Sequence, residues 1–177
     1  MPITPFHFGP GLLGKSLAIR RLSFTGFVAS QIVIDAETAT NILRHHWPAH
    51  GPFHSLLGGT AVGVATAALT WLAIKPLRKS IEKFRPSSPA LKDAVDSDLT
   101  LDAMLLGGAF GGASHSIIDG AMHFDVHPFW PFSKAQPWFG YISGGSVMIV
   151  CVICAILGLM ILWANLGTKR TTETEPT

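Results

Sequence analysis

Long charge-free stretches alternate with charged segments along this chain, and this pattern predicts membrane-spanning helices. Residues 45–74 and 135–168 contain no Asp, Glu, Lys or Arg. Because a span needs about 20 mostly apolar residues, each stretch can hold one, at Ser55–Ile74 and Tyr141–Leu166. A shorter charge-free run, Ala103–Ile118, predicts a third span that needs help from its ends.

The first apolar region, residues 7–34, is interrupted by Lys15 and by a basic pair at residues 20–21. An arginine in the middle of a bilayer costs about 2.5–3.5 kcal/mol. A helical hairpin with arms Gly9–Ile19 and Ser23–Ile34 avoids this cost by placing the basic pair in the headgroups. Each arm is only about 16–18 Å long, against a hydrocarbon core of about 30 Å. The hairpin is therefore expected to tilt, to be extended at its ends or to be re-entrant.

The pattern as a whole predicts an all-α membrane protein, with an N-terminal helical hairpin followed by three transmembrane helices. Residues 1–167 form one membrane-embedded domain, and 168–177 form a polar tail that has no reason to fold. Three polar connections separate the apolar segments: Ile34–His54, the charged 75–99 loop, and the aromatic, proline-rich His123–Pro137 loop.

Basic residues are distributed unevenly over this topology. Eleven of the thirteen Lys and Arg residues lie in the hairpin turn, in the 75–99 loop, in the tail, or at Lys15, which can reach the same side. Only Arg44 and Lys134 lie on the other side. The positive-inside rule therefore places the basic side in the cytoplasm. The hairpin then leaves the N-terminus outside and the C-terminus inside.

Histidines gather on the opposite, non-basic side. Seven of the eight occur in two clusters, His45, His46, His50 and His54, then His115, His123 and His127. The predicted topology brings both clusters to one membrane face, together with the segment Asp35-Ala36-Glu37. His7 joins them if residues 7–34 form a hairpin, but would lie on the cytoplasmic face if they form one continuous span.

These side chains are of the kinds that bind divalent metals. His115 and Asp119 are four residues apart and share one helix face, which His123 joins if the helix continues by a turn. Neutral imidazoles and carboxylates are ligands that zinc prefers after thiolate. The predicted ligands are His7, Asp35, His50, His54, His115, Asp119 and His123. Glu37, Asp125 and His127 are expected to orient the ligands, whereas His45 and His46 are expected to be surface residues.

Seven candidates exceed the three protein ligands of one tetrahedral catalytic zinc. They suit one or two divalent ions, in the second case with a bridging carboxylate and metals about 3.5–4 Å apart. Asp35 or Asp119 would be the bridge, and these two aspartates are the predicted catalytic residues.

Four short motifs resemble the YdjM-like family of inner-membrane, LexA-binding proteins, for which metal-dependent hydrolase activity has been proposed. The motifs are Pro5-Phe6-His7-Phe8-Gly9-Pro10-Gly11, Ile34-Asp35, His50-Gly51-Pro52-Phe53-His54-Ser55, and Ser114-His115-Ser116-Ile117-Ile118-Asp119 followed by His123. The resemblance covers most of residues 1–140. It implies a small multi-pass protein of the bacterial inner membrane whose metal ligands include His7, Asp35, His54, His115 and Asp119.

The second motif departs from the family pattern. Many members resemble His-Arg-Gly-x-Thr-His, with four residues between the histidines, whereas three residues separate His50 from His54 and no arginine follows His50. The resemblance therefore supports His54 more strongly than His50.

Two functions fit these observations. In the first, a metal-activated water attacks a phosphoester or acyl substrate at the extracytoplasmic membrane surface, and a lipid phosphoester is favoured because the site meets headgroups. In the second, the protein is a non-catalytic membrane module whose histidines sense metal or pH. The 75–99 loop is either a topogenic loop or a docking site for a cytoplasmic protein. No nucleic-acid partner is expected, because the net charge is only +2 and no basic-aromatic module is present.

Overall fold

The computed structural model describes residues 5–81, 83, 86 and 88–172, and all regular structure in these residues is helical. The predicted all-α class is therefore confirmed. The elements are η1 (Pro5–His7), α1 (Phe8–Leu17), α2 (Phe24–Leu43), η2 (Pro52–His54), α3 (Leu56–Ile74), η3 (Lys75–Leu77), α4 (Arg78–Ile81), α5 (Pro89–Asp98), α6 (Leu101–Met122) and α7 (Gly144–Thr172).

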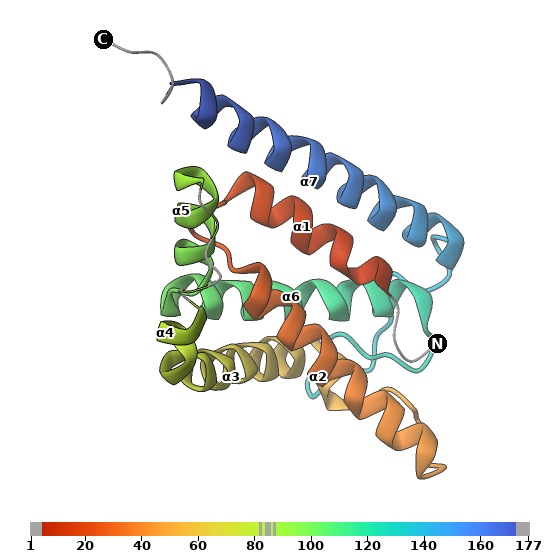
Figure 1. Ribbon diagram of the computed structural model, residues 1–177. Helices are drawn as coiled ribbons and strands as arrows, with labels where there is room; N and C mark the ends of the chain where they lie inside the picture. The colour runs from red at the N-terminus through yellow and green to blue at the C-terminus, as the bar shows by residue number, and fades with distance from the viewer. Residues whose placement is uncertain (1–4, 82, 84–85, 87, 173–177) are drawn as a thin grey trace.

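Helices α2, α3 and α6 pack on one another, and α1 and α7 form a second pair beside them (Figure 1). α7 is the outermost helix and lies along α1. The first helix therefore packs mainly on the last one, and its contact with α2, the other arm of the predicted hairpin, is small. α6 lies near the centre of the molecule, between α1 and α3 (Figure 1).

Glycines bring α3 and α6 into backbone contact. A Cβ atom added to Gly112 would lie 1.9 Å from the carbonyl oxygen of Gly59, and one added to Gly63 would lie 2.2 Å from the carbonyl oxygen of Gly108. Small residues allow this close approach between helices in an apolar environment. At the end of the contact, the Ser116 hydroxyl donates to the carbonyl oxygen of Ser55 at 2.9 Å. The glycines thus fix how closely α6 approaches the start of α3.

The turn between α1 and α2 is held by a residue distant in sequence. Asp98, at the end of α5, accepts hydrogen bonds from the backbone N–H groups of Phe24 at 2.7 Å and Thr25 at 3.2 Å. It also forms a 2.9 Å ion pair with Lys15, which is buried in α1. Ser23 is the N-cap residue of α2. Asp98 of α5 therefore satisfies two of the free N–H donors at the start of α2 and pairs with the Lys15 ammonium of α1.

Helix α2 is longer than the predicted arm that ended at Ile34. It continues to Leu43, so the expectation that a connection begins at Ile34 was wrong for residues 35–43. Residues 35–43 contain neither Gly nor Pro, which would interrupt a helix. The helix ends where His45 adopts a positive φ of 55°, a conformation common just beyond helix C-termini. Asp35 therefore projects from within a helix and not from its end.

The 75–99 segment is also more ordered than the predicted loop, since it contains α4 and α5. Pro89 occupies the start of α5, where its missing N–H costs nothing. Arg20 pairs with Asp93 at 2.8 Å, so the basic turn between α1 and α2 contacts α5.

Two of the described helices are long and apolar enough to cross a membrane, over Leu56–Leu77 and Gly144–Asn165. The third predicted span, Ala103–Ile118, lies in α6 and is not among them. α6 carries many glycines with buried serine, histidine and aspartate side chains, and it is covered by α2 and α3. α7 continues through Thr172, into the predicted polar tail, and residues 173–177 lie outside the described residues.

The helix ends fall at two ends of the molecule. One end, called here the histidine end, contains His7, Asp35, His54, Asp119 and His123. The other, called here the basic end, contains Lys15, Arg20, Arg78, Asp93 and Asp98.

Candidate metal centre

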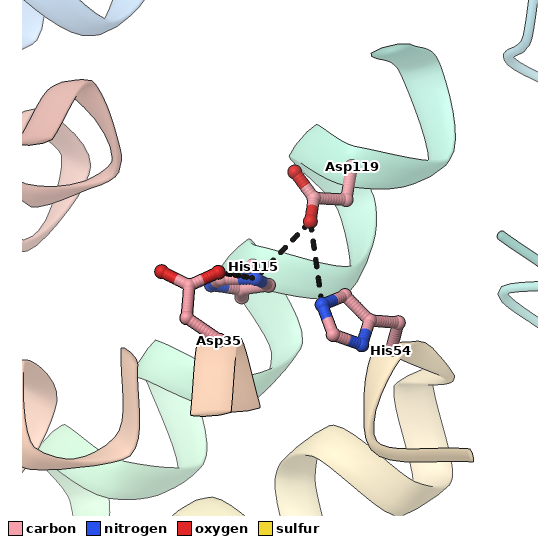
Figure 2. A group of neighbouring side chains, drawn as sticks. All are labelled: Asp35, His54, His115 and Asp119. Atoms are coloured by element: carbon pink, nitrogen blue, oxygen red, sulfur yellow. Dashed lines mark ion pairs between the residues drawn. The ribbon is translucent and has the colours of Figure 1, made fainter. Parts of the chain in front are cut away.

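Four elements contribute to a buried group of side chains at the histidine end, called here the central cluster. His7 comes from η1, Asp35 from α2, His54 from η2, and His115 and Asp119 from consecutive turns of α6. All five residues are buried, and His115 is fully inaccessible to solvent. Ligand atoms of Asp35, His54, His115 and Asp119 all lie within 4.8 Å of one another. Figure 2 shows the last four residues converging from three helical elements.

Asp119 lies at the centre of this cluster. Its Oδ2 atom is 3.1 Å from Nε2 of His115 and 3.5 Å from Nε2 of His54, while Oδ1 is 3.3 Å from Nε2 of His7. Oδ1 of Asp35 is 3.5 Å from Nε2 of His115. Two atoms that bind one tetrahedral zinc at about 2.0–2.1 Å lie about 3.3–3.4 Å apart. The spacing therefore fits neighbouring ligands of a bound ion, and the two oxygens of Asp119 can bridge two ions.

Several polar atoms of the central cluster are buried without a hydrogen-bond partner among the described residues. They are both ring nitrogens of His7, Nε2 of His115 and Oδ1 of Asp119. Leaving such an atom unsatisfied costs about 1–3 kcal/mol. A divalent cation would satisfy the unpartnered lone pairs at once.

The orientation of the His115 ring is set by Gln31. Nδ1–H of His115 donates to Oε1 of Gln31, and Nε2 of Gln31 donates to the Gly111 carbonyl oxygen at 2.9 Å. The second bond fixes which end of the amide is oxygen, so Nδ1 of His115 carries the proton. Nε2 then has a free lone pair, and it faces Asp119. A partner on the remote ring nitrogen is typical of metal-binding histidines.

His54 is oriented in the same way by Glu37. Nδ1–H of His54 donates to Oε2 of Glu37 at 3.2 Å, and the same oxygen accepts the backbone N–H of Phe53 at 3.1 Å. Nε2 of His54 points toward Asp119 and contacts the Thr38 hydroxyl at 3.2 Å. Glu37 thus holds the His54 ring through the nitrogen that faces away from Asp119.

A second group, His50, His123 and Asp125, lies next to the central cluster. Nδ1–H of His50 donates to Oδ1 of Asp125 at 2.8 Å. The His50 ring is 4.4 Å from the His123 ring and 4.8 Å from the His54 ring, measured between centroids. α6 ends at Met122, so His123 does not extend the helical face of His115 and Asp119 as one further turn would have done. It joins His50 instead, and this group could hold a second ion.

Burial has opposite effects on the pKa values of the imidazoles and of the carboxylate at this end. Burial lowers the pKa of His7 to about 4, and the opposing effect of the Asp119 charge is smaller. Burial, followed by the nearby His54, lowers the pKa of His50. These imidazoles are therefore neutral at pH 7, which is the form that binds a metal. Burial raises the pKa of Asp35 to about 6, so it is mostly ionised at that pH.

The remaining histidines are outside both groups. His45 and His46 are exposed beyond the end of α2, as expected. His127 lines a neighbouring pocket of about 380 Å³, and its Nδ1 is buried without a partner among the described residues.

Two contributing residues, Gln31 and Thr38, were missed by the sequence analysis. Gln31, Asp35 and Thr38 follow the i, i+4, i+7 spacing of one helix face. A polar face on an otherwise apolar helix was the signal that could have identified them.

Comparison of the chain with models of protein families, with curated proteins and with solved structures finds no match. The geometry of the site therefore carries the functional argument.

Proposed function

We propose that this protein is a membrane-bound, metal-dependent hydrolase with its site at the extracytoplasmic face of a bacterial inner membrane. The observation that carries the proposal is the convergence of buried, unpartnered nitrogen and oxygen atoms around Asp119. The two apolar helices support a membrane location. The motifs that resemble the YdjM-like family agree with both parts of the proposal.

The set of side chains favours zinc over calcium or magnesium. The central cluster offers three imidazoles and two carboxylates, whereas calcium and magnesium select oxygen ligands. Zinc has no redox chemistry and is suited to hydrolysis. When bound, such an ion lowers the pKa of a coordinated water toward about 7 and so supplies a nucleophile at neutral pH.

The two aspartates have different roles in this proposal. Asp119 contacts three histidines and positions the ions. Asp35 contacts only His115 in the central cluster, and its second carboxylate oxygen points away from that ring (Figure 2). Its side chain is 11% exposed, more than that of any other member of the cluster. We therefore assign to Asp35 the acceptance of the proton from the attacking water.

The decisive measurement is the metal content of the native protein purified in detergent, determined by inductively coupled plasma mass spectrometry. We expect one or two zinc ions per chain, and less than half of this in Asp119→Asn and His115→Ala. His45→Ala is the matched control, because His45 is exposed, and should leave the metal content unchanged. A folded wild-type protein without stoichiometric metal would refute the proposal.

A non-catalytic metal site is the second candidate, because the central cluster is almost completely buried and structural zinc sites are closed to substrate. Hydrolysis of p-nitrophenyl phosphate, bis(p-nitrophenyl) phosphate and p-nitrophenyl acetate by metal-loaded protein separates the two. The hydrolase proposal expects turnover that Asp35→Asn abolishes with metal retained. Full metal occupancy without turnover of any ester would favour the non-catalytic function.

A further inference from the structure

A pocket of about 380 Å³ opens beside the second histidine group. It is lined by four residues of the 48–52 segment, all but Ala49, and by Asp125, His127, Trp130 and Lys134. His50, within that segment, also belongs to the second histidine group. Its ring is 4.8 Å from that of His54, so the pocket adjoins the central cluster through one side chain. The volume is at the lower end of the range of ligand pockets, about 300–1,000 Å³. It suits a small head group and not an entire lipid.

The carboxylate in the wall of this pocket is fully engaged by the protein. Oδ1 of Asp125 accepts from Nδ1–H of His50 at 2.8 Å, and Oδ2 accepts the backbone N–H groups of Ala49 at 3.1 Å and His50 at 3.2 Å. Three donors thus offset the negative charge of Asp125. They reduce the repulsion between this carboxylate and an anion in the pocket.

The positive and donor groups of the pocket are not engaged in this way. Lys134 is exposed and has no ion-pair partner among the described residues. Nδ1 of His127 is buried and has no hydrogen-bond partner in the same part of the chain. Trp130, 42% exposed, adds a flat apolar wall. The pocket is therefore lined by an ammonium group, an imidazole with one unpartnered nitrogen, and an aromatic surface.

We infer that this pocket binds the phosphoryl group of a phosphoester, with Lys134 as its principal anion contact and Trp130 against the adjoining apolar group. The inference rests on the proposed hydrolase function and narrows its substrate to phosphoesters. A lysine is a common point-charge ligand for phosphate. A phosphoester carries a net negative charge that this ammonium complements on binding, whereas a neutral acyl ester offers it only an uncharged carbonyl oxygen.

Binding of phenylphosphonate to the full-length protein in detergent, measured by isothermal titration calorimetry, tests the pocket separately from catalysis. The measurement is made on both metal-loaded and chelator-treated protein. We expect Lys134→Gln to weaken binding about 10-fold to 100-fold in both forms, the range for a hydrogen bond to a charged group. Arg44→Gln is the matched control, because Arg44 is the other basic residue predicted on this side and does not line the pocket.

Equal binding by wild type and Lys134→Gln would overturn the inference, and so would binding of benzoate as tight as that of phenylphosphonate. The same variants also separate this inference from the proposed function. If phenylphosphonate binding depends on Lys134 but the protein has no hydrolase activity, the inferred phosphoryl pocket stands and the proposed hydrolase function is refuted. If Lys134→Gln retains hydrolase activity with an unchanged KM, the hydrolase function is supported and the inferred phosphoryl pocket is refuted.

Phosphate release distinguishes a lipid headgroup from a soluble ester as the source of the phosphoryl group. One arm uses vesicles of phosphatidic acid in phosphatidylcholine, and the other uses phenyl phosphate in detergent. For the substrate that is turned over, phosphatidic acid or phenyl phosphate, we expect Lys134→Gln to increase KM about tenfold if Lys134 binds the phosphoryl group. An unchanged KM for that substrate in Lys134→Gln would overturn the inference that Lys134 binds its phosphoryl group.

Discussion

At the scale of single residues, the site depends on which ring nitrogen of each histidine carries a proton. His54, His115 and His50 each donate from Nδ1 to a fixed acceptor, Glu37, Gln31 and Asp125 respectively. Nε2 of each ring is therefore unprotonated, and in His54 it accepts a hydrogen bond from the Thr38 hydroxyl that an ion would replace. The three partners make the imidazoles ready to bind an ion without a change of tautomer.

Glu37→Gln is expected to weaken zinc binding about 10-fold to 100-fold, the usual cost of losing the partner of a metal-binding histidine. The amide oxygen of glutamine can still accept a hydrogen bond from Nδ1–H of His54, but without the negative charge that makes the imidazole more basic. The measurement is zinc competition with a chromogenic chelator. Asp102→Asn, an exposed carboxylate on the first turn of α6, is the control. Equal zinc affinity of Glu37→Gln and wild type would show that Glu37 has only a structural role.

Sequence patterns identified the candidate ligands better than their partners. His115 and Asp119 share a helix face by spacing alone, and the structure brings them together with His54. Gln31 has no such pattern relation to His115, since the two are 84 residues apart and meet only because α2 packs on α6. Long-range hydrogen bonds of this kind depend on helix packing, which local spacing does not specify.

At the scale of helices, the glycine contact between α3 and α6 sets the distance between His54 and His115. Gly112→Ala would place a Cβ atom 1.9 Å from the Gly59 carbonyl oxygen, so the helices must separate. We expect a loss of stability of about 1–3 kcal/mol or more, together with weaker zinc binding. Gly145→Ala is the matched control, because a Cβ there meets nothing closer than 3.9 Å.

The melting temperature in detergent and the zinc affinity are measured on both glycine variants. A lower melting temperature with unchanged zinc affinity in Gly112→Ala would show that the helix spacing does not control the metal centre. Unchanged values for both quantities would contradict the close packing itself.

The Lys15–Asp98 ion pair provides a second test at this scale. Both side chains are largely buried, and Asp98 also accepts the first two N–H groups of α2. Asp98→Asn is expected to cost about 3–5 kcal/mol, because the Lys15 charge is left buried without its partner. Lys15→Met combined with Asp98→Asn should recover most of this loss. Chemical denaturation of the wild type, both single variants and the double variant gives the coupling energy, and additive effects would contradict the pairing.

The elements were only partly predictable from the sequence. The long apolar helices followed from the absence of charge, and α3 and α7 were found where that pattern placed them. α5 lies in the predicted loop, because its composition is polar, and it contacts the α1–α2 turn through Ser97. The extension of α2 past Ile34 is not evident from hydrophobicity because polar residues begin there, although nothing in residues 35–43 stops a helix.

At the scale of the whole molecule, the separation of a histidine end from a basic end predicts an orientation in the membrane. Lys92 is exposed in α5 at the basic end, whereas Phe132, 86% exposed, lies in the aromatic segment between α6 and α7. The positive-inside rule places Lys92 in the cytoplasm and Phe132 outside. A cysteine at each position, in a background where Cys151→Ala and Cys154→Ala remove the native thiols, reports its side.

We expect a membrane-impermeant maleimide to label Phe132→Cys in bacterial spheroplasts and to label Lys92→Cys only after lysis. This result would place the metal centre outside, because η2 and the C-terminal end of α6 lie at the same end as the aromatic segment. The reverse pattern would place the site in the cytoplasm. Equal labelling of both positions before lysis would mean that no bilayer separates the two ends. The outcome also bears on the substrate, since an outward-facing pocket containing Lys134 would meet phosphoesters of the outer leaflet, and an inward-facing one would meet those of the cytoplasm.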